Sequence, residues 1–103
     1  MPVWKDCWDV PVRVTEERLA HVFEHPEMTS QEERIRQTLA EPEVVVHSLS
    51  DPEVRLYYRS YETAALRTKY LCAVVRWRQN GAFLVTAYFT DRPKRGAQPW
   101  PSR

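Results

Sequence analysis

Hydrophobic positions recur at helical spacing in two segments near the start of the chain. In residues 16–25, the apolar side chains of Leu19, Val22 and Phe23 fall on one stripe, as in an amphipathic helix. The second segment, residues 30–40, begins with Ser-Gln-Glu-Glu, which has the form of a capping box. A proline follows each segment and disfavours helical geometry at the residue before it. The pattern predicts two short helices.

From residue 44 onward the pattern changes to the alternation and β-branched runs typical of strands. Four strands are expected, at residues 44–49, 54–61, 69–78 and 82–91. The pair Asn80-Gly81 between the last two is a strong signal for a two-residue hairpin loop. The expected fold class is therefore α+β, with two N-terminal helices packed on a four-stranded antiparallel β-meander.

This hairpin loop also predicts which strand faces are buried. If Asn80 and Gly81 form the loop, Leu71 pairs with Thr90 and Ala73 pairs with Tyr88. The face expected beneath the helices then carries Tyr70, Cys72, Val74, Phe83, Val85, Ala87 and Phe89. The opposite face has a polar end that a ligand could use. A loop one residue longer would reverse the assignment for one strand, because side chains alternate along a strand.

The chain has the length and composition of a single globular domain. It has 103 residues, of which 43% are hydrophobic and 28% charged, as in ordinary globular proteins. We expect one domain over residues 15–92, preceded by an arm (1–14), in which residues 10–14 form either a short edge strand or an extended segment, and followed by an irregular tail (93–103). No apolar stretch approaches the roughly 18 residues of a membrane helix, and the start lacks the pattern of a signal peptide. The expected location is cytoplasmic, and the two cysteines are expected to be free thiols.

Charge is divided unevenly along the chain. Residues 1–53 hold five Lys/Arg against twelve Asp/Glu, whereas residues 54–103 hold ten against two. Between residues 55 and 78, cations alternate with aromatic residues, a mixture that suits a single-stranded nucleic acid because cations attract phosphates and rings stack on bases. The candidate RNA-binding residues are Arg55, Tyr57, Tyr58 and Arg67. Alternatively, the basic half neutralises the acidic half within one fold.

Two histidines are candidates for catalysis. His21 and His25 are four residues apart and share one side of the first predicted helix. Two imidazoles can act as base and acid when the 2′-hydroxyl of RNA attacks its own phosphodiester. They can equally be solvated or structural. A third ligand at a recognisable spacing is missing, so we expect no metal site.

A second group of candidates lies on the predicted strands. Cations stabilise the charge that develops on a phosphate during cleavage, and hydroxyl groups orient it. These candidates are Arg59, Lys69, Thr86, Tyr88 and Thr90. The same residues can instead form cross-strand polar pairs on a wet sheet face. The chain has no glycine-rich phosphate loop, Cys-x-x-Cys pair or nucleophile elbow, so no cofactor is expected.

Five short segments, taken in order, resemble the barnase–EndoU–colicin–RelE superfamily. They are HVFEHPEM (21–28), EPEV (41–44), VRLYYR (54–59), KYL (69–71) and VTAYFT (85–90). The resemblance implies helices packed on a four-stranded meander and a metal-independent ribonuclease, often a toxin. His21 and His25 match its His-x-x-x-His-Pro-Glu element. Arg59 matches its basic position, and Thr86 and Thr90 match its last-strand threonines.

Two functions are therefore carried forward. The first is a metal-independent endoribonuclease that leaves a cyclic phosphate, toxin-like or phage-associated, with RNA as substrate and an inhibitory protein as partner. The second is a non-catalytic module on the same fold that binds RNA or protein.

Overall fold

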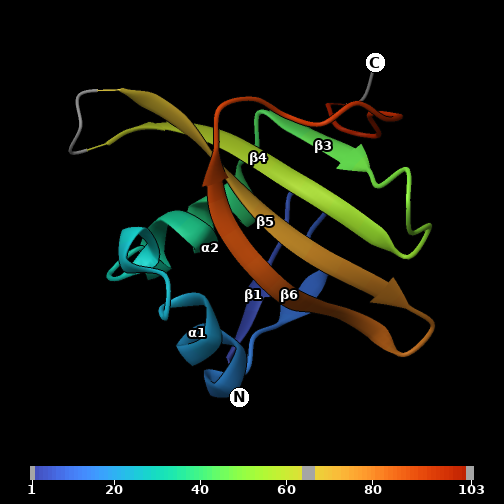
Figure 1. Ribbon diagram of the computed structural model, residues 1–103. Helices are drawn as coiled ribbons and strands as arrows, with labels where there is room; N and C mark the ends of the chain where they lie inside the picture. Colours follow the sequence, from blue (N-terminus) through green and yellow to red (C-terminus); the bar gives the residue numbers. More distant parts are fainter. Residues whose placement is uncertain (1, 64–66, 102–103) are drawn as a thin grey trace.

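The computed structural model describes residues 2–63 and 67–101 and contains one mixed β-sheet (Figure 1). Within these residues the strands are β1 (Val3–Lys5), β2 (Pro11–Arg13), β3 (Val44–His47), β4 (Val54–Glu62), β5 (Thr68–Arg78) and β6 (Gly81–Thr90). Their order across the sheet is β1-β2-β6-β5-β4-β3. β2 runs parallel to β6, and the other neighbours are antiparallel.

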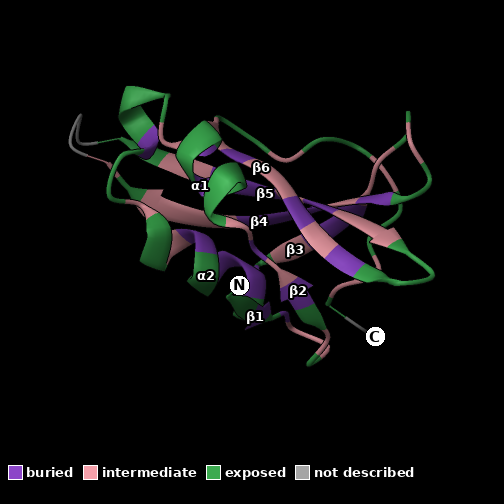
Figure 2. Ribbon diagram, turned by 90° about the horizontal axis from the view of Figure 1, so that it is seen from below, coloured by how far each residue is buried: buried purple, intermediate pink, exposed green. Residues whose placement is uncertain are grey.

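Two short α-helices and one 3₁₀ turn connect β2 to β3. They are α1 (Glu16–Val22), η1 (Pro26–Met28) and α2 (Glu32–Ala40). Figure 2 shows their exposed sides turned away from the sheet and their buried sides turned toward it. None of the helices in the described residues is long and apolar enough to cross a membrane.

A local side-chain cap determines the start of α1 but not that of α2. The Thr15 hydroxyl accepts a hydrogen bond from the Arg18 amide at 3.1 Å, which makes Thr15 the N-cap of α1. The predicted capping box is wrong: Ser30 has a φ of +67°, and α2 starts after Gln31 without a side-chain cap. Ser30 instead turns the chain between η1 and α2.

The predicted four-stranded antiparallel meander is wrong, because six strands form a mixed sheet. The two additional strands come from residues 1–14, which we expected to form an arm. Val12 pairs with Ala82 of β6, and Trp4 pairs with Val12; both side chains are buried. A short strand within residues 10–14 was one of the two alternatives, and β2 lies there, whereas β1 has only three residues, too few for a periodic pattern to appear in the sequence.

The hairpin between β5 and β6 also differs from its prediction. Arg78 pairs with Gly81, so the loop is Gln79-Asn80, and the register shifts again at a bulge in β6 opposite Val74 and Val75. Ala73 consequently pairs with Ala87 instead of Tyr88. A shift of one residue turns every side chain of a strand to the other face.

The face beneath the helices, which we call the helix face, therefore differs from the predicted buried face. Along β5 it carries Leu71, Ala73 and Val75. Tyr70, Cys72 and Val74, which we expected beneath the helices, belong to a smaller cluster on the opposite side. The prediction was correct for Ala87 and Phe89 of β6.

The C-terminal segment covers part of the opposite side. It follows β3, where the Val45 amide donates to the Trp100 carbonyl at 3.2 Å and the His47 amide donates to Ala97 at 2.8 Å. Nearer its start, the Lys94 amide donates to the Tyr58 hydroxyl at 3.1 Å. The segment is irregular, as expected, but it packs over β3 and β4.

We expect the substitution Gly96→Ala to loosen this segment. Gly96 has a φ of +154°, and an added Cβ would overlap the His47 carbonyl oxygen and lie 2.7 Å from Val46 Cγ1. The backbone must move to accept it, so the free energy of unfolding should fall by about 1–2 kcal/mol. Urea unfolding measures the loss, with the exposed Gln98→Ala as control. Equal stability of the two variants would contradict this packing.

Candidate functional site

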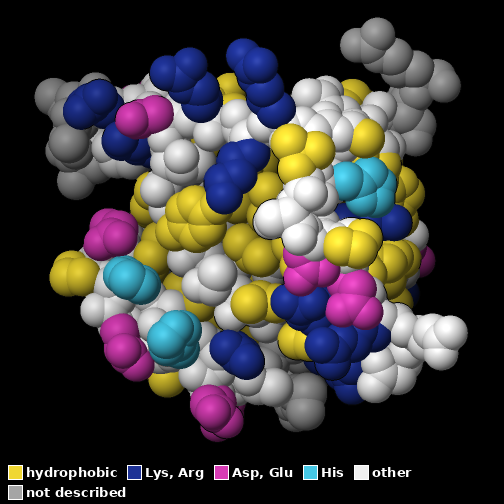
Figure 3. All heavy atoms as spheres, turned by 45° about the vertical axis from the view of Figure 1, so that its right-hand side comes forward, with side chains coloured by type: hydrophobic (Ala, Val, Ile, Leu, Met, Phe, Trp, Pro, Cys, Tyr) yellow, Lys and Arg dark blue, Asp and Glu magenta, His cyan; other side chains and the backbone are white. Residues whose placement is uncertain are grey.

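The side of the sheet opposite the helices has a part that the C-terminal segment leaves uncovered. We call it the open face. It is formed by five half-buried side chains of β5 and β6: Tyr70, Val74, Thr86, Tyr88 and Thr90. Figure 3 shows hydrophobic side chains gathered at the centre of the molecule on this side, with Lys and Arg side chains around them.

Tyrosines dominate the open face and its border. Tyr70 pairs with Thr90, and Cys72 pairs with Tyr88, so the two tyrosines are diagonal neighbours on adjacent strands, within reach of each other. The ring of Tyr58 on β4 meets that of Tyr70 edge-on, with 6.5 Å between centroids. The open face thus offers two adjacent, partly exposed aromatic rings.

The Tyr58 and Tyr88 hydroxyls and the Cys72 thiol on this side are neutral at physiological pH. Burial raises the pKa of the Tyr88 hydroxyl, and that of Tyr58, above the usual range for tyrosine. Burial also raises the pKa of the Cys72 thiol to about 11. None of them is a proton acceptor at neutral pH, so the open face is suited to contact rather than to acid–base chemistry.

Two arginines at the far end of this side are already neutralised. Arg76 Nη1 lies 3.0 Å from Asp51 Oδ2 and 3.0 Å from Glu53 Oε1. Arg78 Nε lies 3.5 Å from Glu53 Oε1. Their charges are therefore largely neutralised by ion pairs within the protein.

The C-terminal segment supplies cations that are not neutralised by ion pairs of this kind. Arg92, Lys94 and Arg95 are exposed and form no ion pair with the part of the chain that the structure describes. The Lys94 amide donates to the Tyr58 hydroxyl at 3.1 Å, so the segment passes beside the open face at Lys94. The sequence pattern did not predict a functional role for this segment, because its position beside the sheet depends on contacts with β3 and β4.

Most of the predicted RNA-binding residues lie elsewhere. The Arg55 guanidinium stacks 3.9 Å over the Trp77 ring on the helix face. Tyr57 is fully buried and donates to Asp6 Oδ2 at 2.6 Å. Tyr58 lies on the open side but is also buried. Arg67 is exposed just before β5. The Arg55–Trp77 contact and the Tyr57–Asp6 hydrogen bond are therefore structural.

The predicted catalytic residues on the strands lie on opposite faces of the sheet. Thr86, Tyr88 and Thr90 come together on the open face. Lys69 and Arg59 lie on the helix face, because they alternate with Tyr70 and Tyr58 along their strands. Lys69 pairs with Asp91, and Arg59 Nη1 donates to the Glu41 carbonyl at 2.6 Å.

The two histidines form a third, separate group. His21 lies on α1 and His25 precedes η1; both are exposed. His21 Nδ1 lies 3.8 Å from Glu24 Oε2. Figure 3 shows two histidines close together at the margin of the molecule among acidic side chains. An acidic surrounding disfavours an approaching phosphate.

Comparison with known proteins adds no assignment: no family model, curated protein or solved structure matches the chain. Among the described residues, no group of three His, Cys, Asp or Glu side chains could hold a metal ion.

Proposed function

We propose that the protein binds single-stranded RNA along the open face. The observation that carries the proposal is the pair Tyr70 and Tyr88, two partly exposed rings on adjacent central strands. Base stacking on an aromatic ring contributes about 1–3 kcal/mol per base and tolerates any sequence. Two such rings at diagonal positions form a platform for two successive bases.

The surroundings of this platform suit a sugar–phosphate backbone. Thr86 and Thr90 place hydroxyl groups beside the rings, where they can donate to phosphate or contact the 2′-hydroxyl that distinguishes RNA from DNA. Lys94 and Arg95 enter from the C-terminal segment, on the β4 side. The proposal therefore places bases over β5 and β6 and phosphates toward residues 92–95.

Metal-independent cleavage of RNA by His21 and His25 is a second proposal. It is supported by the exposure of both imidazoles near one end of α1, which packs on β6. Lys69 and Arg59 would not assist, because Lys69 pairs with Asp91 and Arg59 donates to the Glu41 carbonyl. RNA incubated with the protein in EDTA tests it: cyclic-phosphate ends that disappear in His21→Ala/His25→Ala would support cleavage. Intact RNA with the folded protein would exclude it.

RNA affinity should depend on salt through the cations of the C-terminal segment. For single strands, the slope of log K against log salt is about −0.7 for each phosphate neutralised. Replacing Lys94 and Arg95 together by Gln should therefore make the slope shallower by about 1.4. Fluorescence anisotropy of a labelled RNA of about twelve nucleotides measures it. Arg18→Gln, on the exposed side of α1, is the control, and an unchanged slope in the double variant would contradict the placement.

A further inference from the structure

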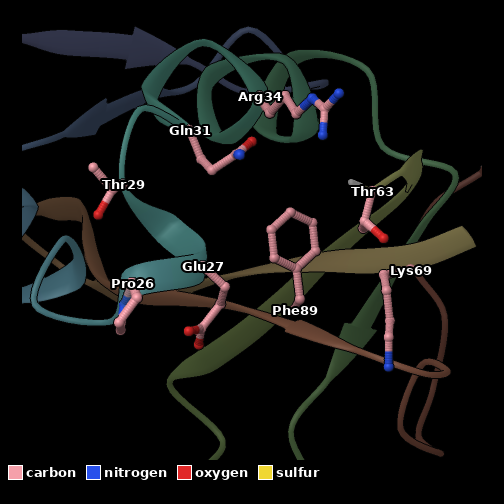
Figure 4. Close-up of a pocket in the computed structure, with 8 residues that line it drawn as sticks. All are labelled: Pro26, Glu27, Thr29, Gln31, Arg34, Thr63, Lys69 and Phe89. Atoms are coloured by element: carbon pink, nitrogen blue, oxygen red, sulfur yellow. The ribbon is translucent and has the colours of Figure 1, made fainter. Parts of the chain in front are cut away.

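A concave site lies on the helix face, at the end of the sheet where β5 begins and β6 ends. Figure 4 shows it between η1, the start of α2 and these strand ends. Its volume is about 590 Å³, within the range of roughly 300–1,000 Å³ typical of small-molecule pockets. It is lined by Pro26, Glu27, Thr29, Gln31, Arg34, Thr63, Lys69 and Phe89. We call it the η1 pocket.

An aromatic ring stands in the middle of this pocket. The Phe89 side chain lies at the centre of Figure 4, between Arg34 on one side and Glu27 on the other. Phe89 is only partly buried, although it packs against the main core. A flat apolar surface of this kind is suited to stack on another ring.

One cation of the pocket is held in place without a counter-ion. Arg34 Nη1 donates to the Glu62 carbonyl at 3.2 Å, and its guanidinium lies 5.0 Å from the centroid of the Tyr61 ring. It forms no ion pair with any residue that the structure describes. A positioned guanidinium with unused donors is a good ligand for phosphate.

The other charged groups of the pocket have different roles. Lys69 is paired with Asp91, and its ammonium points away from the Phe89 ring. It therefore contributes its aliphatic stem rather than its charge. The Glu27 carboxylate and the Gln31 amide lie on the opposite side of the ring from Lys69 and Thr63. The Glu27 carboxylate can accept a hydrogen bond from an amino group of a ligand, and the Gln31 amide oxygen can accept one from a hydroxyl.

We propose that the η1 pocket binds a nucleoside monophosphate. The base stacks on Phe89 with its amino group facing Glu27, the ribose lies beside Gln31, and the phosphate binds Arg34. This inference goes beyond RNA binding on the open face, since it concerns a free mononucleotide on the other side of the sheet. The pocket thus brings an aromatic ring, a guanidinium and two hydrogen-bond acceptors together in one cavity.

Calorimetric titration of the full-length protein with AMP, adenosine and inorganic phosphate tests the ligand class. We expect AMP to bind at least about tenfold more tightly than either fragment, because the ring and the anion each contribute contacts. Arg34→Gln should weaken AMP binding about tenfold or more, the effect of losing a charge-assisted hydrogen bond. Phe89→Leu, which keeps apolar volume but removes the ring, should also weaken it. Arg36→Gln, on the same helix but outside the pocket, should not.

The result that overturns the proposal is AMP binding that is absent, or that is unchanged in both Arg34→Gln and Phe89→Leu. Thermal unfolding of each variant shows that it is folded, and Arg34→Lys, which restores the charge, should recover part of the affinity. The inference is separable from RNA binding: Tyr70→Leu/Tyr88→Leu should still bind AMP. Loss of AMP binding in that open-face variant would contradict the placement of the nucleotide.

Discussion

Replacing Asp6 by Ala should lower the free energy of unfolding by about 3 kcal/mol or more. The Asp6 side chain is buried, at 5% exposure, and accepts three hydrogen bonds. The Tyr57 hydroxyl donates to Oδ2 at 2.6 Å, and the amides of Trp8 and Val10 donate to Oδ1 at 2.9 Å. Each buried donor left without a partner costs about 1–3 kcal/mol. The loss would be a large part of a typical domain's 5–15 kcal/mol.

The reason for so large an effect is that Asp6 joins the first two strands to the centre of the sheet. It closes the turn between β1 and β2, and its hydrogen bond with the Tyr57 hydroxyl connects this turn to β4. Asp6→Asn keeps the acceptor for both amides and should cost less than Asp6→Ala. Lys5→Gln, an exposed neighbour, should unfold like the wild type. If Asp6→Ala unfolded at the same urea concentration as the wild type, the hydrogen bonds of Asp6 would not stabilise β1 and β2 as described.

Removing both aromatic rings of the open face should abolish most RNA binding. Each ring is expected to contribute about 1–3 kcal/mol, so Tyr70→Leu/Tyr88→Leu should weaken binding roughly 30-fold or more. Leucine retains apolar packing on the half-buried positions, so loss of affinity would not reflect loss of folding. Anisotropy titrations of the same labelled RNA measure the effect.

The matched control is Tyr70→Phe/Tyr88→Phe, which removes the hydroxyls but keeps the rings. Because stacking requires the ring face, this variant should bind RNA within a few-fold of the wild type. Weak binding by the phenylalanine variant, or unchanged binding by the leucine variant, would rule out stacking on these side chains as the source of affinity.

Elements with strong local signals were predictable from the sequence. The N-cap at Thr15 needs only a hydroxyl three residues before a free amide, and the structure contains that bond. Both helices were expected near their observed positions, because their apolar spacing is set within a few residues. The strands β3 to β6 were likewise expected from β-branched and alternating runs. Such features depend on neighbouring residues alone.

Features that depend on distant contacts were not predictable. The Asn80-Gly81 pair favours a loop at those two residues, but Arg78 pairs with Gly81 and a bulge follows. The resulting register depends on how the whole sheet packs. β1 and β2 become strands only because β6 provides an edge for Val12 and Asp6 reaches Tyr57.

The candidate site was predictable only in part, for the same reason. Thr86, Tyr88 and Thr90 share a face because they alternate on one strand after the bulge. Lys69 was expected beside them, but the one-residue difference in register places it on the other face. Lys94 has no signal in the sequence, since its place over the sheet comes from contacts made by residues 94–100 with β3 and β4.

The most direct test of RNA binding by the open face is an NMR titration of the labelled protein with single-stranded RNA in EDTA. We expect amide shifts to change at Tyr70, Val74, Thr86 and Tyr88, and at Arg92, Lys94 and Arg95, while those of α1 stay unchanged. Shifts confined to His21 and His25, or no shifts at RNA concentrations that saturate other single-strand binders, would contradict the account.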